Sequence, residues 1–173
     1  MNLLEIMQKE EFEQVFSIME QSFPKEEMRI YEKQKKLLEL PFYHIEVVKN
    51  KEKKIVAFLA YWKLENFYFI EHVAVSKSER GKKIGEKLLK EAFNKWNCFV
   101  VLEVEPPETE IAKRRIDFYK RIGFLFNNFE YFQLPLREGF EKIPLKIMSY
   151  PRNISKEEFE QYKNMLYQTV YQH

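Results

Sequence analysis

The stretch from Phe67 to Trp96 constrains the fold of this chain more than any other part. It opens with an apolar, β-branched and aromatic run, F-Y-F-I-E-H-V-A-V, which has the length of a strand. It closes with a segment whose apolar residues recur at helical spacing: Ile84, Leu88, Leu89, Ala92, Phe93 and Trp96. The polar turn between them holds Gly81 and Gly85, two of the chain's four glycines. The sequence therefore predicts a strand that leads through a glycine-bearing turn into a helix.

This turn is a candidate anion-binding site. The first N–H groups of a helix have no partners within the helix, and the helix dipole adds partial positive charge there. Arg80, Lys82 and Lys83 bring full charges to the same place. The glycine spacing matches neither a P-loop nor a G-x-G-x-x-G dinucleotide turn. We expect the turn to hold a phosphate or pyrophosphate, and the alternative is a solvated basic turn.

The composition excludes several classes of protein. The chain has 29 basic and 27 acidic residues, so its net charge of +2 gives no general case for nucleic-acid or membrane binding. One cysteine, Cys98, allows no internal disulfide, which favours a reducing compartment. No apolar run approaches the ~20 residues that span a bilayer, and the N-terminus does not have the pattern of a signal peptide. The sequence contains no cluster of Cys and His residues, so we expect no metal site. We expect a single cytoplasmic domain over 1–173.

The rest of the chain alternates between predicted strands and helices. Strands are expected over 2–6, 42–49, 54–63, 67–75, 98–105, 124–134 (around a turn at Asn127-Asn128) and 145–150. Helices are expected over 9–23, 25–40, 84–96, 110–122 with Gly123 as its C-cap, and after Ser155, which begins a capping box. This order predicts an α/β (α+β) fold, with a mixed, mostly antiparallel twisted sheet of about seven strands and helices on both faces.

Four motifs in this order resemble the GNAT superfamily of N-acetyltransferases. The first is the strand F-I-E-H-V-A-V at 69–75, which resembles the family's fourth strand and leads into the turn. Arg80-Gly81-Lys82-Lys83-Ile84-Gly85 resembles the R/Q-x-x-G-x-G/A turn that cradles the pyrophosphate of coenzyme A in that family. The strand that ends V-L-E-V-E resembles the family's fifth strand, and I-D-F-Y-K-R-I-G-F at 116–124 resembles its F-Y-x-x-x-G-F helix end. Two positions depart from the family pattern: Lys83 replaces an inner glycine, and Ala112 replaces a common asparagine.

The resemblance implies the acyl-CoA N-acyltransferase fold, with acetyl-CoA as co-substrate. In this family the fourth and fifth strands splay apart and the pantetheine arm lies in the gap, bonded to the backbone. The implied main-chain ligands are Val73, Ala74 and Val75. The implied pyrophosphate ligands are Arg80, Gly81, Lys82, Lys83, Ile84 and Gly85.

Acetyl transfer to an amine also needs acid and base groups. Amines such as a lysine side chain have a pKa of ~10.4, so a base must take a proton, and a carboxylate can do so directly or through water. Glu71 lies on the strand that the resemblance places beside the thioester, and Tyr119 stands at the family's general-acid position. The alternatives are a structural ion pair for Glu71 and a core tyrosine for Tyr119. The N–H of Val73 is the candidate donor to the oxyanion. His72 is expected on the opposite face of the strand, unless a bulge turns it inward.

The sequence thus predicts direct transfer of an acetyl group from acetyl-CoA to a primary amine in a ternary complex. The alternative is a non-catalytic module that binds or senses acyl-CoA on the same fold. A weaker alternative is a nucleic-acid binder built on the basic helix at 113–120. The acceptor is expected to enter near the first two helices and the loop at 135–144. Its identity stays open, and both a monomer and a homodimer fit the sequence.

Overall fold

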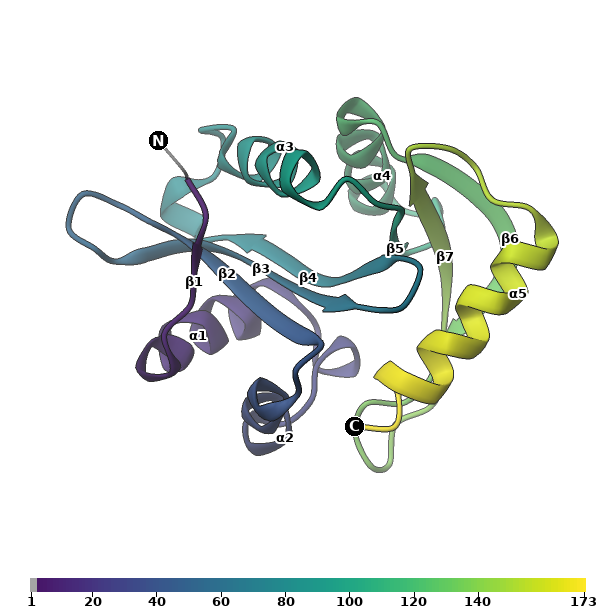
Figure 1. Ribbon diagram of the computed structural model, residues 1–173, viewed down its shortest axis with the longest axis horizontal. Coiled ribbons are helices and arrows are strands. Elements are labelled where there is room, and N and C mark those ends of the chain that lie inside the picture. Colours follow the sequence, from purple (N-terminus) through teal and green to yellow (C-terminus); the bar gives the residue numbers. More distant parts are fainter. Residues whose placement is uncertain (1–2) are drawn as a thin grey trace. The chain divides into compact units, whose positions relative to one another are not determined.

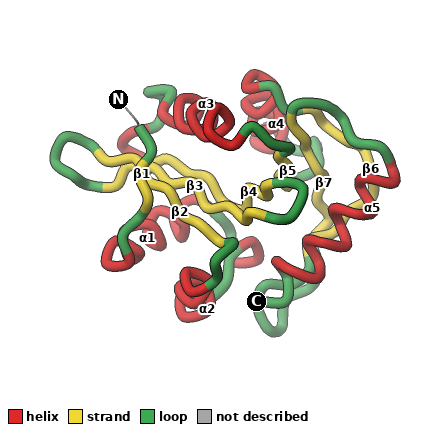
Figure 2. Tube along the Cα trace, viewed as in Figure 1, coloured by secondary structure: helices red, strands yellow, loops and turns green. Residues whose placement is uncertain are grey.

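A computed structural model describes residues 3–173. The chain divides into two compact units, Met1–Cys98 and Phe99–His173, and each holds strands and helices of its own (Figure 1). The path of the chain through these elements is shown in Figure 2. The single domain expected over 1–173 stays a prediction. Among residues 3–173, no helix combines the length and the apolarity that crossing a bilayer requires.

In the first unit, residues 3–98 form four antiparallel strands that neighbour each other in chain order. They are β1 (Glu5–Ile6), β2 (Tyr43–Lys49), β3 (Ile55–Lys63) and β4 (Tyr68–Val75). Helices α1 (Phe12–Ser22) and α2 (Tyr31–Lys36) lie on one face of these strands, and α3 (Ile84–Trp96) lies on the other (Figure 1). The short 3-10 turns are Lys9–Glu11, Lys25–Glu27, Leu37–Glu39 and Lys77–Glu79. Because β3 is central and covered on both faces, its near-continuous apolar sequence is buried up to Trp62.

The helix predicted over 25–40 is wrong in its first part. Lys25–Glu27 is a single 3-10 turn, α2 begins only at Tyr31, and the backbone is extended at Met28 and at Ile30. Arg29, between them, is fully buried and its guanidinium reaches Glu71 on β4. The apolar spacing of the segment favoured a helix, but a buried ion pair with a strand outweighs that local preference.

The second unit contains three strands, with β7 in the middle and antiparallel to both neighbours. They are β5 (Val100–Val104), β6 (Leu125–Gln133) and β7 (Ile143–Tyr150). The helices are α4 (Glu110–Ile122) and α5 (Lys156–Met165), and α5 continues as a π-helical turn over Leu166–Val170. Both predicted caps are confirmed: Gly123 ends α4 with φ 116°, and Ser155 and Glu158 form the capping box of α5.

The turn predicted at Asn127-Asn128 is wrong. β6 runs through this point, and its register with β7 shifts between Asn127 and Tyr131. The Asn127 amide is buried, where its Nδ2 donates to Ser149 Oγ at 2.9 Å and its Oδ1 accepts from the N–H of Ile154 at 3.1 Å. An Asn-Asn pair favours a turn when its side chains bond locally. Here the buried amide bonds β7 and the chain that leads to α5 instead.

Candidate active site

The predicted phosphate turn forms the start of α3. After β4 and one 3-10 turn, the backbone is extended at Arg80, left-handed at Gly81 (φ 83°), and left-handed again at Lys83 (φ 60°), the N-cap of α3. A Cβ at Gly81 would meet no atom within 4 Å, so its glycine is required by conformation and not by space. The left-handed conformation costs a residue with a side chain roughly 1–2 kcal/mol. Lys83 thus takes the conformation that suits glycine.

The cations of this turn are exposed, and two of them contact residues that lie just before it. Lys82 pairs with Glu79 at 2.8 Å, and the Nε of Arg80 donates to the Val75 carbonyl at 3.2 Å. No side chain caps the start of α3. Ile84 and Gly85 form its first turn, so the structure brings the predicted residues 80–85 together at one helix start. A helix start with three cations beside it is suited to bind an anion.

The three predicted main-chain ligands on β4 differ in whether their backbone groups point toward β3 or away from it. The N–H of Ser76 donates to the Val56 carbonyl at 2.8 Å, and the register pairs Ala74 with Phe58. Hydrogen-bonded and non-hydrogen-bonded pairs alternate along an antiparallel ladder. Ala74 therefore turns its N–H and C=O toward β3, whereas Val73 and Val75 turn theirs away from β3. An extended ligand beside β4 would meet the backbone of Val73 and Val75.

Glu71 sits on a β-bulge. The register pairs His72 with Ala60 and Ile70 with Tyr61, so Glu71 has no Cα partner on β3. A bulge reverses the alternation of side chains at that point. Glu71 and His72 consequently share the face covered by α1 and α2, where both contact the segment that follows α1. The expectation that His72 points to the opposite face is wrong, and the bulge is the reason.

Both oxygens of the Glu71 carboxylate have donors. Arg29 Nη1 lies 2.7 Å from Oε1 and Trp62 Nε1 lies 3.1 Å from Oε2, and the Arg29 and Glu71 side chains are 0% and 4% exposed. Burial raises the pKa of Glu71, but the charges of Arg29 and His72 and the hydrogen bonds from Arg29 and Trp62 outweigh it. The net pKa lies below the ordinary value. Glu71 is therefore an ionised carboxylate at neutral pH.

The hydrogen bond of His72 fixes its tautomer. His72 Nε2 lies 2.7 Å from the carbonyl oxygen of Glu27, which can only accept, so Nε2 carries the proton of the neutral ring. The lone pair is then on Nδ1, which is buried, has no hydrogen-bond partner, and lies 3.8 Å from Glu71 Oε2. Burial lowers the pKa of His72 below its ordinary value of 6.5, although Glu71 and the Glu27 carbonyl oppose this shift. The ring is neutral at pH 7.

Tyr119 lies in the last turn of α4 and is buried. Its ring packs edge-on against Phe118 and Phe124, and its carbonyl accepts from the N–H of Phe124 where the helix ends. Ala112 is buried, and its N–H donates to Thr109 Oγ1 at 3.1 Å. The helix start thus receives its polar contact from Thr109, although Ala112 stands where an asparagine was expected.

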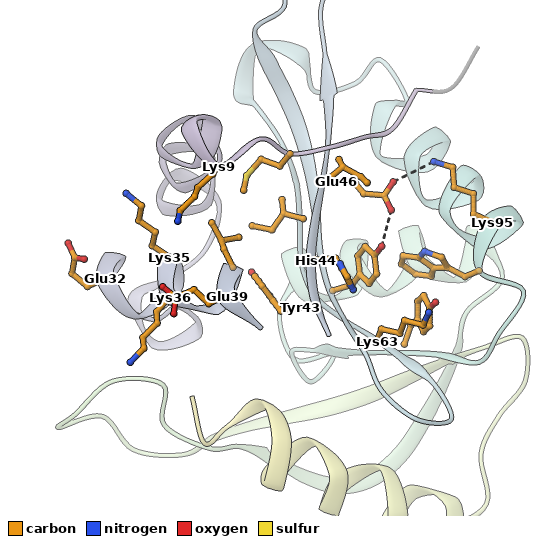
Figure 3. Close-up of a pocket in the computed structure, with 17 residues that line it drawn as sticks. Lys9, Glu32, Lys35, Lys36, Glu39, Tyr43, His44, Glu46, Lys63 and Lys95 are labelled. Carbon is orange, nitrogen blue, oxygen red and sulfur yellow. Dashed lines mark hydrogen bonds and ion pairs between the residues drawn. The ribbon is translucent and has the colours of Figure 1, made fainter. Parts of the chain in front are cut away.

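A separate hollow of about 880 Å³ lies in the first unit, near the start of β4 and the end of α3. Figure 3 shows the residues that line it. Tyr68 at the start of β4 and Trp96 at the end of α3 line it, whereas the phosphate turn joins the end of β4 to the start of α3. Glu46 bonds Tyr61 and Lys95 on one wall (Figure 3). The predicted catalytic and cofactor residues are not among those that line it.

Two residues of the site, Arg29 and Trp62, were missed by the sequence analysis. Arg29 stands within a segment that reads as an amphipathic helix, and only its place beside the buried Met28 could have marked it as an interior cation. Trp62 reads as part of an apolar strand.

Within residues 3–173, no group of three or more His, Cys, Asp or Glu side chains is placed to hold a metal ion.

Comparisons with known proteins agree with this arrangement. Residues 41–125 match the model of the GNAT acetyltransferase domain. No curated protein matches the chain at a significant level. Among solved structures, a Bacteroides thetaiotaomicron protein assigned to the GNAT family of acetyltransferases has a TM-score of 0.88 and 27% identity, over 97% of each chain.

More distant structures share the fold alone. The ribosomal-protein-S18-alanine N-acetyltransferase of Escherichia coli has a TM-score of 0.66 and 18% identity, over 91% of this chain and 97% of that one. An aminoglycoside 6'-N-acetyltransferase complexed with coenzyme A has a TM-score of 0.62 and 13% identity, over 88% and 100%. The predicted fold class, a sheet of seven strands with flanking helices, is confirmed. Residues 41–125 thus carry a GNAT acetyltransferase domain, and the predicted resemblance to the GNAT superfamily is confirmed.

Proposed function

We propose that this protein is an N-acetyltransferase, which transfers the acetyl group of acetyl-CoA directly to a primary amine in a ternary complex. The observation that carries the proposal is the turn at 80–85. Two left-handed residues, Gly81 and Lys83, open the uncapped start of α3 beside three cations, in a chain of a family of acetyltransferases. This arrangement supports binding of the pyrophosphate of coenzyme A.

The backbone of β4 supports a place for the pantetheine arm. Val73 and Val75 turn their N–H and C=O groups away from β3, which suits an extended chain that bonds to β4 as an added strand would. The N–H of Val73 is then the candidate donor to the oxyanion that forms when the amine attacks the thioester. We include Ala74 as a neighbouring contact, because its own backbone groups belong to the ladder with β3.

Two side chains are proposed for proton transfer. Glu71 supplies the carboxylate that draws a proton from the amine, directly or through water, and its ionised state at neutral pH supports this role. Tyr119 supplies the proton that the leaving thiolate gains. Proton transfer of this kind contributes typically ~10²–10⁴-fold to a rate.

The acceptor is proposed as a class. The structural neighbours include acetyltransferases of spermidine, of the alanine of ribosomal protein S18 and of an aminoglycoside, and all three acceptors carry an amine. We therefore propose a primary amine and test these three kinds first. A cytoplasmic location stays a prediction, and so do the absence of nucleic-acid partners and the choice between monomer and homodimer.

A second candidate function is a non-catalytic acyl-CoA binding module. The Arg29–Glu71 contact favours it, because a carboxylate whose two oxygens both have donors is also what a purely structural ion pair requires. The two functions differ in turnover and not in coenzyme A binding.

The experiment combines calorimetry with coenzyme A and an assay of free thiol released from acetyl-CoA. The assay uses spermidine, a peptide with an N-terminal alanine, and an aminoglycoside as acceptors. For the enzyme we expect binding of coenzyme A and release of thiol with at least one amine. Tyr119→Phe is expected to bind coenzyme A normally and to release thiol at least about tenfold more slowly. Binding without thiol release supports the non-catalytic module, and absence of coenzyme A binding refutes both functions.

A further inference from the structure

The Glu71–His72 pair contains one proton site that the proposed roles leave unused. Glu71 Oε1 and Oε2 already accept from Arg29 and Trp62. His72 Nδ1 is buried, has no partner, and lies 3.8 Å from Glu71 Oε2. The Glu71 carboxylate and the unprotonated His72 Nδ1 are both hydrogen-bond acceptors and lie next to each other. A proton added to Nδ1 would make it a donor that faces the carboxylate.

We propose that His72 is the proton-holding partner of Glu71, so that the proton drawn from the acceptor amine comes to rest on His72 Nδ1 while Glu71 remains a carboxylate paired with Arg29. This inference rests on the proposed function and deepens it. His72 acts through Glu71, and it is a positioning and proton-holding residue.

Arg29 makes Glu71 a poor place for the proton to stay. The two side chains are 0% and 4% exposed and 2.7 Å apart. A proton on Glu71 would neutralise the partner of a fully buried guanidinium, which leaves a buried charge with weaker compensation. The same addition at His72 Nδ1 forms an imidazolium directly opposite the Glu71 carboxylate, which compensates the new charge.

The intrinsic basicities of the two groups favour the same site. Unperturbed histidine and glutamate titrate about two pH units apart, near ~6.5 and ~4.3, which is a preference of roughly a hundredfold for the imidazole. The groups that act electrostatically on His72 are Glu71 on its own strand, and Arg29 and the Glu27 carbonyl from the segment after α1. Of these, Glu71 and the Glu27 carbonyl stabilise the imidazolium, and Arg29 opposes it.

The ring is also held in one orientation. Nε2–H donates to the Glu27 carbonyl at 2.7 Å, and the Phe23 ring packs edge-on at 4.8 Å between centroids. The ring cannot offer Nε2 as the acceptor without breaking that bond. Nδ1 is therefore the only ring nitrogen that can take a proton in this position.

The amine nitrogen forms a bond to the thioester carbon and loses one proton, which passes by way of Glu71 to His72 Nδ1. The carbon–sulfur bond breaks, and the leaving sulfur takes the proton of the Tyr119 hydroxyl. The proton then returns from His72 to Tyr119 through solvent, so a neutral amine gives an amide and a free thiol with no net change in the enzyme.

The first test needs no substrate. The protein contains three histidines, so ¹⁵N-histidine labelling with His44→Gln and His173→Gln as assignment variants resolves the His72 ring by NMR. We expect a neutral ring with its proton on Nε2 at pH 7. In Glu71→Gln we expect the protonation midpoint of His72 to fall by about one pH unit or more, because an opposite charge has been removed. A proton on Nδ1 at pH 7, or an unchanged midpoint in Glu71→Gln, overturns the proposal.

The second test is kinetic and uses the best acceptor from the amine panel. His72→Gln keeps an N–H donor for the Glu27 carbonyl but has no basic nitrogen. We expect kcat to fall about 100-fold or more, with KM for acetyl-CoA unchanged. The double variant Glu71→Gln/His72→Gln is expected to be no slower than the slower single variant, because groups that act as a unit are not additive. His44→Gln, the same change at a half-buried histidine of β2, is the matched control and is expected to keep the wild-type rate.

A rate within twofold of wild type for His72→Gln, or additive losses in the double variant, overturns the proposal. If Glu71→Gln does not fold, the proposal is tested by the tautomer of His72 in the wild-type protein and by the rate of His72→Gln. If the wild-type protein acetylates none of the amines, the proposed function fails. The tautomer and titration of His72 still decide whether Glu71 and His72 form a proton-holding pair.

Discussion

Glu71→Gln is expected to destabilise the protein strongly, because it removes one partner of a buried ion pair. Arg29 Nη1 and Glu71 Oε1 lie 2.7 Å apart, and both side chains are almost fully buried. Removal of one partner of such a pair typically costs about 3–5 kcal/mol, since the remaining charge loses its compensation. For a chain of 150–250 residues, 1 kcal/mol shifts Tm by roughly 2–4 °C. We therefore expect Glu71→Gln to lower Tm by about 6–20 °C.

The double variant Arg29→Met/Glu71→Gln separates the pair from its surroundings. When both charges are removed, no uncompensated charge remains, and replacement of a buried pair by uncharged groups is often near neutral. We expect the double variant to regain most of the lost stability, with a coupling free energy of about 2 kcal/mol or more between the two positions. Urea denaturation of the wild type, the two single variants and the double variant gives the four values.

The control is Glu160→Gln, which breaks an exposed pair with Lys163 of the same 2.7 Å separation. An exposed pair contributes about 0–1 kcal/mol, so we expect Tm to change by at most about 4 °C. A loss below about 1 kcal/mol for Glu71→Gln, or additive losses at Arg29 and Glu71, would refute the reasoning.

The same pair predicts a dependence on pH. The folded-state pKa of Glu71 lies below its ordinary value of 4.5, so its charged form stabilises the fold above that pH. This contribution is lost as the pH falls from 4.5 toward the folded-state pKa of Glu71, because the unfolded chain binds the proton in that range and the folded state does not. The difference in stability between wild type and Glu71→Gln is therefore expected to shrink in acid.

Three further predictions concern other parts of the chain. Lys83→Gly relieves a left-handed backbone at φ 60° but removes a cation, so we expect calorimetry to show weaker binding of coenzyme A. The free energy of unfolding is expected to stay within about 1 kcal/mol of the wild-type value. Lys53→Gly, at φ 62°, is the matched control and should leave the binding of coenzyme A unchanged. Asn127→Ala removes buried hydrogen bonds to β7 and to the chain before α5, and is expected to lower the free energy of unfolding by about 1–3 kcal/mol in urea. The hydrogen bonds from Arg152 and Ser155 lower the pKa of Glu158 to about 2, so the stability that Glu158→Gln removes at pH 7 should diminish between pH 4.5 and 2 in thermal scans.

The sequence predicted those elements whose ends are set by local chemistry. α4 begins and ends where Thr109 and Gly123 cap it, and α5 begins at its capping box. The phosphate turn could be located because glycines and cations between a strand and a helix are a local pattern. The conformation of Lys83 could not be predicted, because a lysine reaches the left-handed region only where its neighbours impose it.

The errors all involve partners that are distant in the sequence. The helix expected over 25–40 breaks because Arg29 pairs with a carboxylate 42 positions away. The bulge at Glu71 depends on register with β3, which no pattern within β4 reveals. Asn127 resembled a turn residue because its hydrogen-bond partners, Ser149 on β7 and Ile154, lie more than 20 positions away in the sequence. The residues next to Asn127 in the sequence do not reveal these partners.

The attachment of the segment between α1 and α2 to β4 limits how this protein can be redesigned. That segment reaches the strand at two points, through the guanidinium of Arg29 and the carbonyl of Glu27. A graft of residues 24–30 from a homologue without a cation at the position of Arg29 would leave the buried Glu71 carboxylate without its ion-pair partner. Loop and strand therefore form one module for transplantation, and chimaeras that exchange both together are expected to fold where exchanges of the loop alone do not.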